Sequence, residues 1–125
     1  MVDSALGNTP IYIKREESNH YISTILSASA VTSGNIIDVR NLKNLAAFVT
    51  RASSANATEL EVSPNGSNWW QWKNFPTGAV LSAGDRASLT DAQGQNMAIS
   101  YVRGHVTTFN AGQPNVVIVL NGLTK

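Results

Sequence analysis

The stretch Thr58-Glu59-Leu60-Glu61-Val62-Ser63-Pro64-Asn65-Gly66 decides the fold class that this sequence predicts. Leu60 and Val62 alternate with two glutamates, and a period of two is typical of a strand with one buried face. A Pro-Asn-Gly turn follows directly, in which Gly66 can take a positive φ at little steric cost. Residues 58–75 are therefore expected to form a β-hairpin.

The chain on either side of this hairpin consists of similar short segments, rich in Val, Ile, Thr and aromatic residues and separated by Gly, Asn, Asp and Pro. These segments cover residues 21–30, 35–40, 45–51, 58–63, 68–75, 79–82, 97–109 and 115–121. About seven or eight such strands fill a two-sheet sandwich of roughly a hundred residues. The sequence predicts an all-β, antiparallel two-sheet sandwich.

One segment also fits a helix, because Leu42, Leu45, Ala46 and Val49 have the spacing of a helix face. A strand is preferred, since apolar residues at positions 45, 47 and 49 alternate over a stretch that is short for a helix. The long connection over residues 76–95 is expected to be functional or to contain a minor strand.

Residues 116–120 are all apolar, so a strand formed by them would be apolar on both faces. The run lies between Pro114 and Gly122. Such a strand is expected to be covered on both sides. One of its faces is a candidate interface.

The first part of the chain, residues 1–20, differs from the body over residues 21–125. It holds Gly7, Pro10 and a cluster of charged residues, and its apolar group is Ile11, Tyr12 and Ile13. Residues 1–20 are interpreted as an extended N-terminal arm, anchored on a neighbouring subunit by these three side chains. A frayed tail and an edge strand of the domain itself are the alternatives.

Composition limits the possible functions. The 125 residues fit one domain, and a net charge of +1 lacks the basic face that nucleic acid requires. The chain has no cysteine, so disulfides and thiolate sites are excluded. No apolar run is long enough for a membrane span and no secretory signal is recognised, so synthesis in a cytoplasm is expected. Only 14% of the residues are charged, which fits either a surface covered by neighbours or a β-rich protein that uses hydroxyl groups for solubility.

Residues for catalysis or metal binding show no suggestive pattern. His20 and His105 lack acidic residues at ligand spacing, and no nucleophile motif, phosphate loop or calcium loop occurs. Glu59 and Glu61 share a strand face, which is typical of a solvated surface. We expect a non-enzymatic protein with no cofactor and no metal.

All three tryptophans, Trp69, Trp70 and Trp72, lie within four residues of each other. Strand alternation places Trp70 and Trp72 on one face, and Trp69 on the other with Gln71. Exposed tryptophan beside amides can stack on a sugar or anchor a protein interface. The remaining alternative is that all three tryptophans lie in the core or are covered by the connection over residues 76–95.

The segment from Leu60 to Trp69, the later Tyr101-Val102-Arg103 and the final apolar strand resemble small β-sandwich proteins of tailed phages. In those proteins a "Ser-x-Asp/Asn-Gly-x-x-Trp" hairpin precedes a "Tyr-x-Arg" strand. The resemblance implies Trp69 as a core tryptophan, and Arg103 as a side chain that fixes a loop or a carboxylate. Asn65 stands where Asp is more usual, and the turn accepts both.

The resemblance implies a virion component of the capsid decoration or cement type, or a head, neck or tail accessory subunit. Expected partners are the major capsid protein or other virion subunits, in a homo-oligomer such as a trimer, with no nucleic acid and no membrane. The partner-binding residues would be Ile11, Tyr12, Ile13, Trp70 and Trp72. A carbohydrate-binding or receptor-binding module, with Asn68 and Gln71 beside the two tryptophans, is the alternative.

Overall fold

The computed structural model describes residues 19–80, 82, 84–89 and 99–125, and the chain within these ranges forms nine strands. The strands are β2 (His20–Ala28), β3 (Thr32–Ser33), β4 (Ile37–Asp38), β5 (Leu42–Thr50), β6 (Ala57–Ser63), β7 (Trp70–Phe75), β8 (Asp85–Leu89), β9 (Tyr101–Thr108) and β10 (Val116–Thr124).

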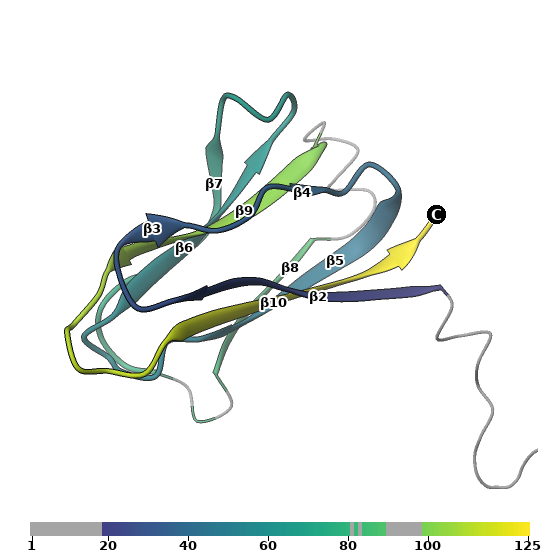
Figure 1. Ribbon diagram of the computed structural model, residues 1–125. Coiled ribbons are helices and arrows are strands. Elements are labelled where there is room, and N and C mark those ends of the chain that lie inside the picture. Colours follow the sequence, from purple (N-terminus) through teal and green to yellow (C-terminus); the bar gives the residue numbers. More distant parts are fainter. Residues whose placement is uncertain (1–18, 81, 83, 90–98) are drawn as a thin grey trace, which may run out of the picture.

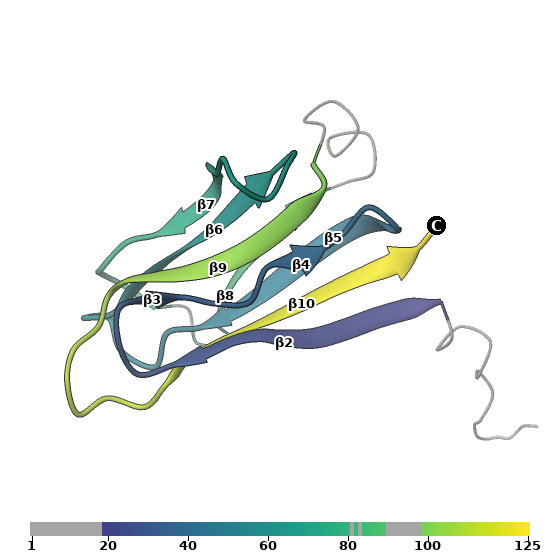
Figure 2. The same ribbon diagram turned by 45° about the horizontal axis from the view of Figure 1, so that its top comes forward.

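The strands form two antiparallel sheets that face each other, as Figures 1 and 2 show from two sides. The first sheet has the order β2-β10-β5-β8. The second has the order β3-β9-β6-β7, and β4 also pairs with β9. This arrangement confirms the predicted all-β sandwich. The last strand, β10, lies between β2 and β5, so the end of the chain is central to the first sheet.

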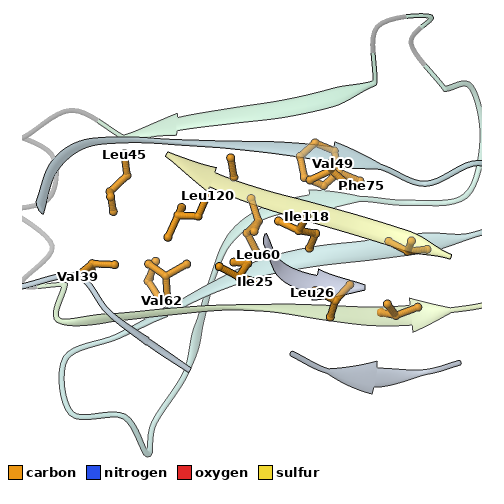
Figure 3. Packing of buried hydrophobic residues seen from close by; sticks show 14 of the residues in the cluster. Ile25, Leu26, Val39, Leu45, Val49, Leu60, Val62, Phe75, Ile118 and Leu120 are labelled. Atoms are coloured by element: carbon orange, nitrogen blue, oxygen red, sulfur yellow. The ribbon is translucent and has the colours of Figure 1, made fainter. Parts of the chain in front are cut away.

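The core lies between the sheets, where alternate residues of facing strands meet (Figure 3). Leu60 of β6 and Ile118 of β10 are completely buried. Each apolar side chain of this size contributes about 1.5–3 kcal/mol when it is removed from water. Among the described residues, the buried members of the cluster are Ile25, Leu26, Val39, Leu42, Leu45, Ala47, Val49, Leu60, Val62, Phe75, Val102, Val106, Val116, Ile118 and Leu120.

Most predicted segments are strands, and the ambiguous segment at residues 42–50 is strand β5. The predicted hairpin is confirmed, because β6 pairs antiparallel with β7 from Thr58 to Val62. The sheet begins at His20, so residues 19 and 20 of the predicted arm belong to the described body. Residues 1–18 lie outside the described residues.

The strand predicted over residues 79–82 is wrong, because Ala79, Val80 and Ser82 are not in a strand. The carbonyl of Ala79 accepts a hydrogen bond of 2.8 Å from the guanidinium of Arg51, and this bond replaces a sheet partner. The minor strand of the long connection is β8, which begins at Asp85 and pairs with β5.

Candidate partner-binding surface

The hairpin turn after β6 is held by side chains of the Ser-x-Asn-Gly motif. The Ser63 hydroxyl accepts hydrogen bonds from the backbone N–H groups of Asn65 (3.1 Å) and Gly66 (2.8 Å). The Asn65 carboxamide oxygen accepts from the N–H groups of Ser67 and Asn68, both at 2.9 Å. Gly66 has φ +79°, so glycine avoids the strain that other residues meet there. These contacts make the motif a structural turn.

The Tyr-x-Arg residues of β9 pack on the outer face of the second sheet beside this turn. Arg103 lies over the ring of Trp69, with 4.2 Å between its guanidinium carbon and the ring centroid. Its Nε also donates to Oε1 of Glu61 at 2.6 Å. Tyr101 is contacted in the same way by Arg40, at 5.5 Å. Arg103 therefore fixes a carboxylate, as the resemblance implied, and it also stacks on Trp69, which was not expected.

Arg40 also forms an ion pair with Asp38 at the edge of this sheet. The guanidinium donates from its Nε at 3.0 Å and from the terminal nitrogen at 2.6 Å, and both carboxylate oxygens accept. The side-chain hydrogen bond from Arg40 lowers the pKa of Asp38 to about 2. The carboxylate stays charged over the whole physiological range, so this exposed pair keeps Arg40 in place over Tyr101.

The implied core position of Trp69 is wrong. Trp69 is half-buried on the outer face, because it precedes β7 and stacks on Arg103 there. The tryptophan that reaches the core is Trp72, which is half-buried and packs against the core cluster. Trp72 lies at a register shift between β6 and β7, where one extra residue enters the edge strand.

Trp70 is the most exposed of the three tryptophans, with 57% of its surface accessible. It lies opposite Val62 in the β6–β7 ladder, beside a shallow pocket of about 360 Å³. The pocket is lined by Val62, Ser63, Pro64, Trp70, Gln71 and Ile99. Its wall is mainly apolar and its rim carries an exposed indole. The structure thus separates Trp70, which is accessible to a partner, from Trp72, which is largely taken up by the fold.

The other three predicted partner-binding residues, Ile11, Tyr12 and Ile13, lie outside the described residues. Their role as an anchor stays a prediction.

The middle of the outer face carries a row of polar groups across three strands. Glu59 of β6 lies opposite His105 of β9, whose Nδ1 is 2.8 Å from the hydroxyl of Ser33 on β3. Partial burial raises the pKa of Glu59 above its ordinary value of 4.5. A hydrogen bond with Glu61 and the negative charge of Glu61 raise this pKa further. His105 and Arg103 oppose this shift.

This raised pKa predicts the effect of Glu59→Gln on stability. Because the folded state holds the Glu59 proton more tightly than the unfolded chain, protonation stabilises the fold below about pH 4.5, and this contribution is lost as the pH rises through the folded-state pKa. The Gln variant should therefore be more stable than the parent at neutral pH, and the difference should disappear in acid. Urea unfolding midpoints measured against pH test this.

Glu61→Gln is the matched control on the same strand, because it removes the ion pair with Arg103 and should lower the stability at neutral pH. A Glu59→Gln variant that is less stable than the parent at neutral pH would show that the charged Glu59 carboxylate does not destabilise the fold.

A buried polar network at the other end of the sandwich was not predicted from the sequence. Arg51 is 2% exposed, and its Nε donates to Oδ2 of Asp85 at 2.7 Å. Its other nitrogens donate to the carbonyls of Asn56, Pro76 and Ala79. The Asn56 side chain donates to the Arg51 carbonyl. The network joins the loops after β5 and β7. Its polar groups bond to one another, so we assign the network a structural role.

Within the described ranges, no three His, Cys, Asp or Glu side chains are grouped as a metal site would need. The described part of the chain contains no helix with the length and apolar character needed to span a membrane.

Comparisons with known proteins support the fold. No protein-family model and no curated protein matches the sequence. Among solved structures, the crystal structure of the SPBc2 prophage-derived protein YomS is similar, with a TM-score of 0.60. The match covers 85% of this chain and 94% of that chain, at 11% sequence identity. At this identity the likeness shows a shared fold.

Proposed function

We propose that this protein is a non-enzymatic structural subunit of a phage-like particle, of the capsid decoration or accessory type. It binds a neighbouring virion subunit through the surface around Trp70. The observation that carries the proposal is the exposed Trp70 at the rim of a mainly apolar pocket on an edge strand.

An apolar pocket beside an exposed indole has the properties of a protein interface. Tryptophan is enriched among the residues that dominate binding energy, and apolar side chains of a partner fill such hollows. Among the described strands, none pairs with the outer side of β7, which is an edge of the second sheet. A partner can approach there without rearrangement of the described strands.

The surface around Trp70 offers few aromatic and polar side chains for binding a sugar, which is the alternative function. Trp72 packs against the core, so Trp70 is left without a second stacking ring from that residue. Ser63 is fully buried and its hydroxyl already holds the turn. Among the pocket residues, Gln71 supplies the exposed polar side chain. Recognition of several sugar hydroxyls needs more convergent polar groups than this.

Two further observations support a phage setting. The Ser-x-Asn-Gly-x-x-Trp and Tyr-x-Arg residues that carry the resemblance to tailed-phage sandwiches meet in one structural unit around Trp69 and Arg103. A prophage-derived protein also shares the fold over most of its length.

The decisive experiment is to purify particles by density gradient from the strain that encodes this chain, after induction, and to detect the protein by peptide mass spectrometry. The full chain should be found in the particle band. Trp70→Ala should lower its occupancy, with a loss of about 2 kcal/mol or ~30-fold in affinity if Trp70 is a dominant contact. The melting temperature should change little, because the indole is mostly exposed.

Ile36→Ala is the matched control, since Ile36 is 51% exposed and lies between β3 and β4, at the other edge of the second sheet. It should leave particle binding unchanged. A protein that is absent from the particle band would refute the structural role. A glycan array with strong binding that Trp70→Ala abolishes would favour the carbohydrate module instead.

A further inference from the structure

The edges of the two sheets differ in how they are protected against pairing with another chain. β7 carries a bulge at its register shift and an exposed Lys73 opposite the buried Leu60. β8 is five residues long and begins Asp85-Arg86. β3 and β4 are two residues each. Bulges, charges and short length are the usual means of preventing strand addition.

Strand β2 has much less of this protection. It is nine residues long, His20–Ala28, and its sequence contains no Asp, Glu, Lys or Arg. It pairs with β10 on one side, and within the described residues no strand pairs with it on the other. The bulge at Ile25 affects the second half, where the Ile25 carbonyl accepts the N–H of Asn35 at 3.2 Å. The open part of the edge is therefore residues 20–24.

The outer face next to Ile22 and Thr24 carries no charge on β2 or β10, whereas Lys43 of β5 lies beside Leu123 in the row of His20. Ile22 is 60% exposed, and Phe48 on β5 is 49% exposed. Register places Thr24, Val119 and Phe48 in one row across three strands. The nearest charge in this row is Arg86 on β8, the far strand of the sheet. This face explains why β10 is apolar on both sides.

We propose that residues 20–24 of β2 pair antiparallel with β2 of a second copy of this chain, about a two-fold axis. A free backbone edge requires an extended strand, and the uncharged surface of β2 and β10 around Ile22 favours a strand that brings no charge of its own. β2 meets both requirements itself. An antiparallel pair of identical strands is self-complementary, so Ile22 of each copy extends the apolar face of the other.

This proposal is independent of the function proposed for Trp70. β2 belongs to the first sheet and β7 is the edge of the second, next to β6 and away from β9 and β4. Figure 2 shows these two edge strands on different sides of the sandwich. A dimer through β2 would leave both copies of Trp70 free for another partner.

The test is the mass of the full chain by light scattering over a series of concentrations, for the parent and for two matched variants. Ile22→Lys places a charge at the proposed edge, whereas Ile36→Lys makes the same change at a residue of similar exposure on the second sheet. We expect a dimer for the parent and for Ile36→Lys. The dissociation constant of Ile22→Lys should rise at least tenfold, since two lysines would meet across the axis.

Amide hydrogen exchange distinguishes edge pairing from packing of the faces. The amides of residues 20–24 that point away from β10 should be protected in the parent dimer and should exchange faster in Ile22→Lys. A parent that stays monomeric or forms a trimer, or a dimer without this protection, would overturn the proposal. So would a monomer formed by the full chain with Ile11, Tyr12 and Ile13 all changed to Ser, because the arm would then be the occupant.

Discussion

Replacing Asp85 by Ala is expected to lower the free energy of unfolding by about 3 kcal/mol. The substitution leaves the guanidinium of Arg51 charged, 2% exposed and without its 2.7 Å carboxylate partner. Breaking a buried ion pair from one side costs about 3–5 kcal/mol, because the remaining charge is not compensated. The lower end applies here, since Arg51 keeps the carbonyls of Asn56, Pro76 and Ala79. Urea denaturation at neutral pH measures the loss.

Glu61→Ala is the control for this prediction. The Glu61 to Arg103 pair is equally short, at 2.6 Å, but its side chains are 15% and 24% exposed. Solvent compensates part of the lost interaction at such a site, so the cost should be clearly smaller than that of Asp85→Ala. Equal losses in the two variants would contradict the distinction that is drawn from burial.

The sandwich itself could be predicted from the sequence because its strands carry local signals. Leu60 and Val62 alternate with glutamates, and both are buried while the glutamates lie on the other face. The turn at Gly66 is equally local, since the side-chain hydrogen bonds of Ser63 and Asn65 described above all join residues within 63–68.

The Arg51 network could not be predicted in this way. Arg51 and Asp85 are 34 residues apart, and neither has a local pattern that marks it as buried. The same network explains the wrong strand at residues 79–82, where the Ala79 carbonyl accepts a hydrogen bond from the distant Arg51 guanidinium.

The tryptophan cluster was predicted only in part, for a related reason. Alternation placed Trp69 and Gln71 on one face, and the contact of Trp69 with Arg103 agrees with this. Alternation could not decide which face was core, since that depends on which face of the second sheet the first sheet covers. It also could not distinguish Trp70 from Trp72, because only the packed core shows which indole is covered.

Gly34→Ala is expected to have the second large effect on stability. Gly34 directly follows β3 in the second sheet, and its N–H donates to the Gly104 carbonyl at 2.8 Å. A β-carbon on Gly34 would lie 2.5 Å from the backbone oxygen of Ile25. Because a backbone atom cannot rotate away, the strands must separate. Overpacking of this kind costs about 3 kcal/mol, the upper part of its usual range.

Gly104→Ala is the matched comparison, because its β-carbon would meet the Cδ1 atom of Ile118, also at 2.5 Å. Here the obstacle is the end of a side chain, which Ile118→Val removes. The double variant Gly104→Ala/Ile118→Val should therefore be more stable than the sum of the two single losses predicts, by about 1 kcal/mol or more.

Leu26→Ala should give no such recovery of stability when it is combined with Gly34→Ala. Leu26 Cδ1 is 2.9 Å from the added β-carbon, but the Ile25 carbonyl oxygen would still clash with that carbon. Thermal and urea unfolding of the four single variants and the two doubles measure both couplings, and recovery in the Gly34 pair would show that the side chain rather than the backbone sets the cost.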